Sequence, residues 1–241
     1  MRHDPWPRKK FGASLRKIGA LSYHHQHPFH VLMNSGKLGR RAIQIWVANR
    51  FYYQTNIPIK DAAILSNCPL REVRRAWLHR VMDHDGAKGD EGGIGAWLRL
   101  GEACGLSRKE LLGHNHVVPG VRFPVDAYVN FARTQPWPVA VASSLTELFA
   151  PDLMAKRLEA FKRYYPWVEA SGLEYFSRRL VQAPRDSGEA LKLTFDHCTT
   201  LEMQQAALRA LQFKCDLLWA MLDAIHGRCM NSKAVPKPSA G

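Results

Sequence analysis

The segment YHHQHPFH, residues 23–30, places four histidines within seven positions of a 241-residue chain that has 11 histidines. A run of this kind can ligate a metal, carry protons in catalysis, or serve only the start of a helix. Helical di-iron sites combine carboxylates with Glu-x-x-His motifs, and the sequence contains no Glu-x-x-His. We therefore predict no metal site, and the role of the histidines depends on the rest of the chain.

In several predicted helices, apolar residues follow one face and polar residues occupy the next turn of the same face. Lys214, for example, lies three residues after Leu211 and four before Leu218, so it falls on the apolar stripe of its helix. A lysine on such a stripe is unusual. The polar residues found in these positions are Arg50, Gln54, Arg80, His84, Tyr175, Arg179 and Lys214.

Convergence of these residues would create a cationic cavity inside a helical protein. Buried cations need partners, so the cavity predicts a ligand with several carboxylates, which arginine binds bidentately and lysine contacts as a point charge. Histidine and tyrosine in the same place would be acid–base candidates. The alternative is that each long cationic side chain reaches solvent from the edge of its stripe.

The elements that must position these residues are helices, because apolar residues recur mostly at i, i+3, i+4 and i+7 and strand signals are scarce. The fold class is predicted to be all-α, a single-domain bundle at 11–228, with a flexible N-terminus at 1–10 and a disordered tail at 229–241. Helices are expected at 11–20, 38–56, 58–66, 70–84, 93–104, 124–134, 137–149, 151–163, 168–182, 186–197 and 200–226.

Cysteine content and the pattern of apolar residues indicate the cellular compartment. The five cysteines are odd in number and form no C-x-x-C, which favours reduced thiols over a disulfide framework or a zinc site. The basic N-terminus is followed by no apolar signal-peptide core. No run of about 18 apolar residues is present. A cytoplasmic protein without a membrane partner is predicted.

The net charge of +13 predicts an anionic partner, which can be nucleic acid, an acidic membrane or a small polyanion. Residues 59–80 read tolerably as a helix-turn-helix, with Arg71, Arg74, Arg75 and Arg80 on the second helix. Against this, NCP at 67–69 is a poor turn, and the apolar residues of the segment would need a small domain around them. Steep salt dependence would identify nucleic-acid binding.

Seven segments, in order from about residue 12 to 226, resemble the pyrroloquinoline-quinone synthase family. They are YHHQHPFH, ANRFYYQTNIPIKDAAILSN, RVMDHDG, VDAYVNFA, SSLTELFAP, YFSRRLVQAPRD and LQFKCDLLWAMLDA. Each alone is a weak signal, whereas seven in register cover nearly the whole chain. The resemblance implies a helical bundle like that of haem oxygenase and the thiaminase-like TenA proteins, working as a homodimer.

The resemblance also implies an activity. The family performs the last step of pyrroloquinoline quinone (PQQ) biosynthesis on a bicyclic, quinone-like amino acid with several carboxylates. It closes the third ring and oxidises the product with O2, releasing H2O2, without metal, flavin or haem. Such a substrate matches the cationic cavity, so PQQ and its precursor are the expected partners and nucleic acid is not. No cofactor is expected.

Site residues follow from the positions that match the family. The residues expected to bind substrate carboxylates and quinone oxygens are Arg50, Arg80, Arg157 and Lys214. Those expected to line the pocket and orient the ring system are Tyr23, His24, Tyr53, Gln54 and Tyr128. His84 is the leading general acid–base, while Tyr175 and Arg179 lie on the O2 side, where Arg179 would stabilise reduced oxygen. The catalytic set is therefore His84, Tyr175, Arg179, Lys214 and His24. By the same resemblance, His25, His27 and His30 are structural groups near a helix that starts at Pro28.

Met154 departs from the family pattern, which often has histidine there. A thioether cannot shuttle protons or donate a hydrogen bond, so Met154 is expected only to line the pocket. Two alternatives share the fold. A thiaminase-like enzyme would need a cysteine nucleophile beside a carboxylate base, and a haem-oxygenase-like oxidase would need metal ligands; neither motif is evident in this sequence.

Overall fold

Residues 4–231 are described in the computed structural model of this chain, and within that range the structure is helical without a strand. One isolated β-bridge joins Ala87 and Asp90. The α-helices are α1 (Arg8–Ser22), α2 (Pro28–Asn34), α3 (Arg40–Asn67), α4 (Arg71–Asp85), α5 (Gly92–Ala103), α6 (Arg108–Leu112), α7 (Pro119–Thr134), α8 (Trp137–Ala142), α9 (Ala150–Tyr164), α10 (Glu174–His197) and α11 (Leu201–Asn231). The 3-10 helices are η1 (His24–Gln26), η2 (Ser143–Phe149) and η3 (Ala170–Leu173).

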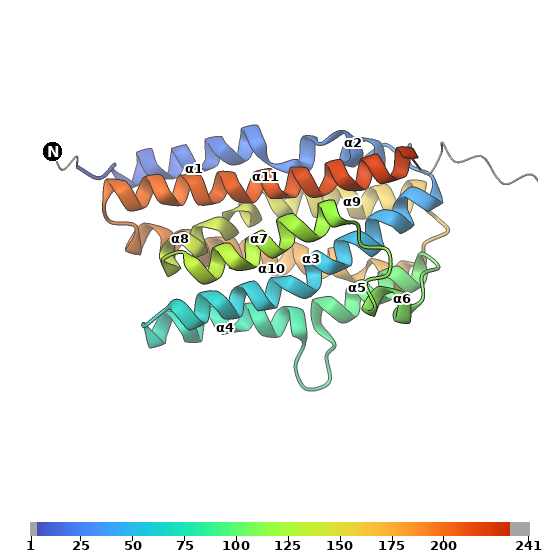
Figure 1. Cartoon of the computed structure of the whole chain (residues 1–241), viewed down its shortest axis with the longest axis horizontal. Coiled ribbons are helices and arrows are strands. Elements are labelled where there is room, and N and C mark those ends of the chain that lie inside the picture. The colour runs from blue at the N-terminus through green and yellow to red at the C-terminus, as the bar shows by residue number, and fades with distance from the viewer. Residues whose placement is uncertain (1–3, 232–241) are drawn as a thin grey trace, which may run out of the picture.

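Two long helices organise the bundle. Helix α11 runs the length of the molecule beside α1 and packs on α7, α8 and η2 (Figure 1). Helix α3 packs on α4, α5 and α7, while α10 contacts α9, η2 and α5. The predicted all-α bundle is therefore confirmed, with its long helices enclosing a common interior.

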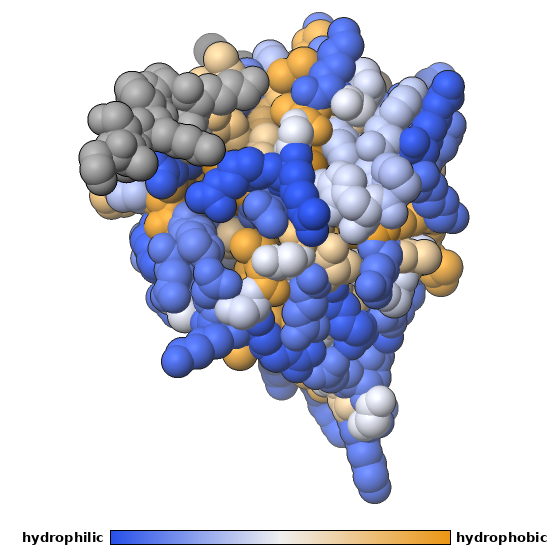
Figure 2. Space-filling view, turned by 90° about the vertical axis from the view of Figure 1, so that its right-hand side faces the viewer, coloured by the Kyte–Doolittle hydropathy of each residue, from blue (hydrophilic) through white to orange (hydrophobic). Residues whose placement is uncertain are grey.

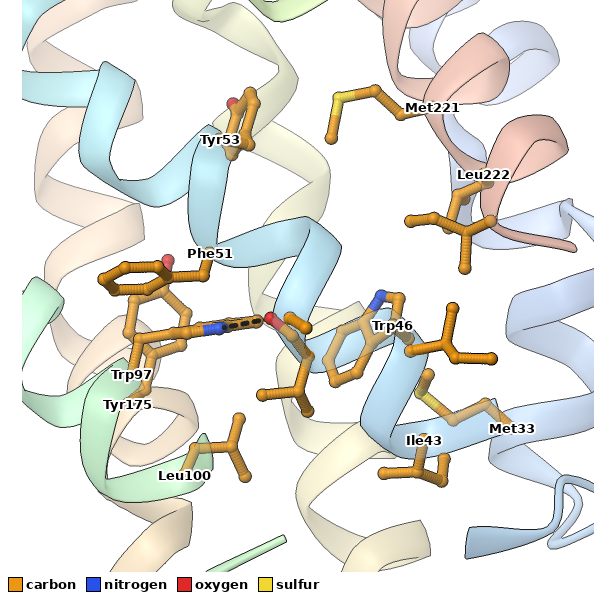
Figure 3. Packing of buried hydrophobic residues seen from close by; sticks show 14 of the residues in the cluster. Met33, Ile43, Trp46, Phe51, Tyr53, Trp97, Leu100, Tyr175, Met221 and Leu222 are labelled. Carbon is orange, nitrogen blue, oxygen red and sulfur yellow. Dashed lines mark hydrogen bonds between the residues drawn. The ribbon is translucent and has the colours of Figure 1, made fainter. Parts of the chain in front are cut away.

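Aromatic rings form the layer below the polar interior. Trp46 of α3 packs edge-on against Trp97 of α5, with ring centroids 5.3 Å apart, and the Trp97 indole donates a hydrogen bond of 3.0 Å to the Val47 carbonyl. Trp97 in turn packs edge-on against Tyr175, with centroids 4.8 Å apart (Figure 3). This rigid layer joins α3, α5 and α10, the helices that carry part of the predicted site.

Local sequence sets several helix ends. Pro28 occupies the first turn of α2, where its missing N–H costs nothing, and the His27 side chain accepts a hydrogen bond of 3.0 Å from the Phe29 N–H. The predicted helix start at Pro28 and the structural role of His27 are confirmed. At its C-terminal end, α4 stops at Gly86, whose φ of 93° favours glycine.

The predicted break between 38–56 and 58–66 is wrong, because α3 continues through Pro58. The side chains of Thr55 and Asn56 donate hydrogen bonds of 2.9 and 2.8 Å to the Tyr52 carbonyl, so the polar QTN stretch supports the helix instead of ending it. Pro58 is itself buried. Packing on α4 and α7 outweighs the loss of one helical hydrogen bond at the proline.

The second half of the chain differs from prediction in three places. Helix α10 runs unbroken through Pro184, so the predicted helices 168–182 and 186–197 are one helix, which begins only at Glu174. The predicted helix 137–149 is α8 followed by η2. Helix α7 begins at Pro119, five residues before the predicted start at 124, because a proline is well placed in a first turn.

Both ends of the described chain are more ordered than the predicted boundaries suggest. Helix α1 begins at Arg8, inside the segment 1–10, and the Trp6 N–H donates a hydrogen bond of 2.7 Å to the side chain of Gln204. Helix α11 extends to Asn231, three residues beyond 228, and Cys229 is buried. The rest of the predicted tail, 232–241, and residues 1–3 lie outside the described residues.

Hydrophilic residues dominate the end of the bundle that Figure 2 presents, and hydrophobic residues there form separate small groups. The projection at its lower edge is the connection between α4 and α5, which also stands out in Figure 1. Among residues 4–231, none of the helices combines the length and apolar character that a bilayer crossing requires.

Candidate active site

The predicted site residues come from separate helices and meet in the interior. Those of the N-terminal segment and α3 are joined by those of α4, α7, α9, α10 and α11. All of them are buried except Arg50, which is half-buried. The contacts among them divide the site into two regions of different charge. We call them the open cationic region, with Arg50, Arg157 and Lys214, and the paired cationic region, with Arg80 and Arg179.

The open cationic region holds three cations without a carboxylate. Among residues 4–231, no aspartate or glutamate lies within ion-pairing distance of Arg50, Arg157 or Lys214. The Arg157 Nε is buried with no hydrogen-bond acceptor in that part of the chain. Because burying an unpaired charge is costly, this region is built to receive an anion.

Lys214 of α11 lies between two tyrosine rings. A hydrogen bond of 2.6 Å joins its Nζ to the Tyr53 hydroxyl, and the Nζ lies 3.4 Å from the centre of the Tyr128 ring. Burial, followed by the charges of Lys60 and Arg50, lowers the pKa of Lys214 well below its usual value. Burial also raises the pKa of Tyr53, although Arg50 opposes this. Lys214 can therefore change protonation state when an anion arrives.

The rings around Arg50 and Arg157 hold these guanidiniums by cation–π contact instead of ion pairing. The Arg50 guanidinium lies 4.0 Å from the centre of the Tyr53 ring. The Arg157 guanidinium lies 5.0 Å from the Trp46 ring. Burial and Arg50 lower the pKa of Arg157 to about 9, which still leaves it charged at neutral pH. Both groups keep N–H donors for a ligand.

A chain of hydrogen bonds connects His24, His30 and Arg157. His30 Nδ1 lies 3.0 Å from the His24 carbonyl, which can only accept, so His30 Nδ1 carries the proton. Its Nε2 then accepts the hydrogen bond of 3.0 Å from Arg157 Nη2. His24 Nδ1, 3.1 Å from His30 Nδ1, is left as an acceptor, so His24 carries its proton on Nε2. Burial, then Arg50 and Arg157, lower the pKa of His24, which keeps the ring neutral.

His30 belongs to the site, so the prediction that it is only structural is wrong in this respect. It is buried, fixes the tautomer of His24 and orients Arg157. Its position six residues after His24 brings the two rings together only because η1 ends and α2 begins between them. The sequence shows the histidine but not that turn. Tyr23 and His24 do lie side by side in the site, with ring centroids 4.3 Å apart.

The paired cationic region is the opposite case. The two oxygens of Glu147 accept hydrogen bonds of 2.7 Å from Arg80 and 3.2 Å from Arg179. Asp186 accepts a further bond of 3.0 Å from Arg179, and Asp61 lies 3.6 Å from Arg80. Carboxylates thus hold both guanidiniums in place before any ligand binds. Arg80, predicted to clamp substrate carboxylates, already has three acidic neighbours.

His84 and Tyr175 face this region with defined hydrogen-bond roles. His84 Nδ1 lies 3.0 Å from the Arg80 carbonyl, so Nδ1 is the donor and Nε2 is left with a lone pair. Burial and then Arg179 lower the pKa of His84 to about 4, so the ring is neutral at pH 7 and its Nε2 lone pair is free to accept a proton or a hydrogen bond. The Tyr175 hydroxyl donates a hydrogen bond of 2.9 Å to the Gln54 side-chain oxygen. Met154 is buried in the apolar cluster one turn before Arg157.

Sequence reasoning missed the acids that hold the cations. Lys60 is buried and donates to Asp61 at 2.5 Å and to Ser144 at 3.1 Å, while the Trp77 indole donates to Asp61 at 2.9 Å. The rule that buried cations need partners was the available signal. Acids in the resembling segments were the places to look, since Glu147 lies in SSLTELFAP and Asp186 in YFSRRLVQAPRD.

A surface pocket of about 570 Å³ adjoins the open cationic region. It is lined by residues of η1, α2, η2 and α9, and it shares Tyr23 with the site. Phe149, which also lines the pocket, packs on the Tyr23 ring with centroids 5.6 Å apart. These two rings therefore separate the pocket from the buried histidines and arginines.

One group of potential metal ligands occurs among residues 4–231, formed by His79, Asp83 and Asp186. The guanidinium of Arg185 contacts both of these aspartates. A cation is thus already present between the acids, and this group has no contact that marks it as a metal site.

The comparisons with known proteins follow this geometry. The family model described as the TENA/THI-4/PQQC family matches residues 13–224. The chain belongs to the TENA/THI-4/PQQC family. The predicted resemblance is thereby confirmed. A pyrroloquinoline-quinone synthase of Pseudomonas aeruginosa strain LESB58 is 58% identical over 218 residues, which cover 90% of this chain and 87% of the relative. One from Cronobacter sakazakii is 58% identical over 216 residues, covering 90% and 86%.

Several solved structures have the same fold at low sequence identity. A Shewanella denitrificans domain of unknown function, described as having a heme oxygenase-like fold, superposes with a TM-score of 0.79 at 12% identity, covering 98% of this chain and 99% of the other. A TenA homologue from Pseudomonas syringae pv. tomato gives a TM-score of 0.73 at 13% identity, covering 96% and 98%. The predicted haem-oxygenase-like fold is confirmed.

Proposed function

We propose that this protein is a pyrroloquinoline-quinone synthase, which closes the third ring of a bicyclic polycarboxylate precursor and oxidises it to PQQ with O2. The observation that carries the proposal is the open cationic region, because three cations without carboxylates suit a substrate that brings several. The relatives at 56% to 58% identity over 90% of the chain have the name of this enzyme.

The binding step is assigned to the open cationic region. Substrate carboxylates bind to Arg50 and Arg157, and Lys214 contacts a third anionic oxygen. Tyr23, Tyr53 and Tyr128 surround the ring system with apolar faces. His24 supplies an N–H donor from Nε2, as its tautomer requires. Binding thereby satisfies the buried donors that the empty site leaves unpaired.

The oxidation steps are assigned to the paired cationic region. His84 removes a proton from the substrate through its free Nε2 lone pair. Each O2 that is reduced to H2O2 takes two electrons from the substrate and two protons from the substrate and its surroundings. Arg179, fixed by Glu147 and Asp186, stabilises the negative charge on reduced oxygen. Tyr175 lies beside it on the O2 side.

We further propose that the reaction uses no metal, flavin or haem, that the protein acts as a homodimer, and that it works in the cytoplasm. The buried thiols of Cys68, Cys104, Cys198 and Cys215, none of which forms a disulfide, support a reducing compartment. The mass in solution by light scattering tests the dimer. Metal analysis of active protein tests the cofactor proposal, and activity that tracks metal content would contradict it.

Two alternatives are disfavoured by specific contacts. A thiaminase-like cysteine nucleophile needs an accessible thiolate, whereas burial raises the pKa of Cys104, Cys198 and Cys215 to about 12. A helix-turn-helix would need its own small core, whereas Val73 and Trp77 pack into the shared core of the bundle.

The test is an absorbance titration with the bicyclic precursor, first without O2 and then with it. We expect a reduced, quinol-like spectrum that becomes the PQQ spectrum when O2 is added, with H2O2 formed. No spectral change in either condition would contradict the proposal.

A matched pair of variants tests the binding assignment. Arg157→Met should weaken PQQ binding by roughly 10- to 100-fold, the equivalent of losing hydrogen bonds to a charged group of about 1.5–3 kcal/mol. Lys162→Met removes an exposed cation from the same helix and should leave the affinity unchanged. Equal effects would mean that only the overall charge attracts the ligand.

A further inference from the structure

Asp186 has no role in the reaction proposed above beyond its contact with Arg179, yet it is the best-connected acid in the protein interior. It lies on α10, seven residues after Arg179, and is 1% exposed. Seven residues are two helical turns, so both side chains lie on the same face of α10.

The two oxygens of Asp186 have different tasks. Oδ2 faces inward, 3.0 Å from Arg179 Nη1 and 3.8 Å from Arg80 Nη1. Oδ1 faces outward, 2.8 Å from Arg185 Nη2 and 3.2 Å from His79 Nε2. One carboxylate therefore connects the paired cationic region to groups at the protein surface.

The outward partners are held in their turn. The Arg185 side chain is 48% exposed and also pairs with Asp83 of α4. His79, also on α4, lies 3.6 Å from Glu189 of α10. Asp186 is thus fixed by contacts that bridge α4 and α10, and its inner oxygen has little freedom to move.

Glu147 alone does not fix Arg179. It gives that guanidinium one hydrogen bond of 3.2 Å and shares its other oxygen with Arg80. The remaining polar contact of Arg179 is to Gln182, at the long distance of 3.5 Å. Arginine has several rotatable bonds, so its guanidinium keeps one direction only where its contacts hold it there. The shortest of its contacts, that to Asp186, decides where the guanidinium points.

We propose that Asp186 is a positioning residue that sets the direction in which Arg179 presents its guanidinium to the reacting centre, from an anchor at the protein surface. The inference rests on the proposed function, in which Arg179 stabilises reduced oxygen. Asp186 does not touch the substrate. It remains ionised throughout the working pH range, because Arg80 and Arg179 lower its pKa more than burial raises it.

The main variant is Asp186→Asn in the full chain. The asparagine amide has only one oxygen, so its N–H₂ group must face the N–H donors either of Arg179 or of Arg185, and the charge that holds Arg179 is lost. Arg179 then no longer has one fixed direction. We expect the O2-dependent step to slow by roughly 10- to 100-fold, the range that about 1 Å of misplacement costs. The affinity for PQQ should change by less than about threefold, since the open cationic region is untouched. Stopped-flow mixing of the anaerobic complex with O2 measures the first quantity, and an absorbance titration measures the second.

The matched control is Asp196→Asn, the same change at an acid of α10 that pairs with Arg8 and Lys192 and with none of the partners of Asp186. We expect both quantities to stay at the wild-type level in this variant. A second test variant is Arg185→Gln, which removes only the outer anchor. The position is half-exposed, so we expect the variant to fold. It should slow the O2-dependent step in the same direction but by a few fold, and Arg185→Lys should restore part of the rate.

The outcomes separate the inference from the proposed function. Arg179→Ala with an unchanged O2-dependent step would contradict the role of Arg179, and with it that of Asp186. A slow Arg179→Ala together with a normal Asp186→Asn would overturn only the inference. Parallel losses of rate and PQQ affinity in Asp186→Asn would show a general structural role and also overturn it. Should Asp186→Asn fail to fold, a normal Arg185→Gln overturns the inference and a slow one supports it.

Discussion

Replacing Lys214 by methionine should abolish the uptake of a proton that accompanies PQQ binding. In the empty site Lys214 lies between Tyr53 and Tyr128, close to Arg50 and Lys60, with no carboxylate in ion-pairing distance among residues 4–231. Burial and the two neighbouring cations lower its pKa well below 10.5, which favours the neutral amine. An anionic ligand beside it reverses the balance and favours the ammonium form.

The sign of the effect follows from the two pKa values. Between the low pKa of the empty site and the higher pKa of the complex, binding takes up one proton, so affinity falls tenfold for each pH unit of increase. One unit corresponds to about 1.36 kcal/mol. From pH 7 to 8.5 the dissociation constant for PQQ should rise, by at most about 30-fold, which is the limit for uptake of one proton over this range. The range ends at about pH 8.5 because Arg157, with a pKa of about 9, also begins to lose its proton above it.

The assay is a titration with PQQ at several pH values, supported by calorimetry in two buffers of different ionisation enthalpy, which counts protons directly. Lys214→Met should bind more weakly at pH 7 and show no slope. A flat wild-type profile would mean that Lys214 keeps one protonation state throughout. An equal slope in Lys214→Met would assign the proton to another group. Either result would refute the reasoning.

Four further predictions concern single substitutions. His84→Ala should slow proton-coupled oxidation at every pH between about 5 and 8. The wild-type rate should not change with pH in this range, because the pKa of His84 is about 4. An unchanged rate in the variant would exclude His84 as the base. Met154→His should alter H2O2 release without changing PQQ affinity, and a large loss of affinity would contradict this prediction. Gly19→Ala should destabilise the protein by about 1–3 kcal/mol, because the new Cβ would lie 1.8 Å from the Phe149 ring. Gly188→Ala, with no atom within 4 Å, should instead stabilise it by about 0.5–1 kcal/mol in denaturant unfolding.

The periodicity of the sequence was enough to predict the bundle but not its longest helices. Apolar residues at helical spacing marked the helices, and all of the predicted segments are at least partly helical. The predicted helices are interrupted beside Pro58 and around Pro184, although α3 and α10 continue through both prolines. The cost of a proline inside a helix is local, whereas the packing that outweighs it is tertiary and cannot be read from local sequence.

The cations of the site were predictable, whereas their partners were not. A lysine or arginine on an apolar stripe stands out in a sequence, as Lys214 does. An acid such as Asp186 or Glu147 does not, because it lies among other polar residues and its importance depends on which guanidinium the fold brings to it. His30 was missed for the same reason, since its contact with Arg157 joins residues 127 positions apart.

The division between paired and unpaired cations explains how one site can both bind and react. Arg80 and Arg179 carry their acids with them, so they are oriented before the substrate arrives and need no reorganisation during the reaction. Arg50, Arg157 and Lys214 lack acids, so the substrate itself supplies the compensating charge and is thereby selected. A neutral analogue would leave the two guanidiniums unpaired. In the proposed function, discrimination against it therefore arises from the open cationic region, whereas the rate of oxidation depends on the paired cationic region.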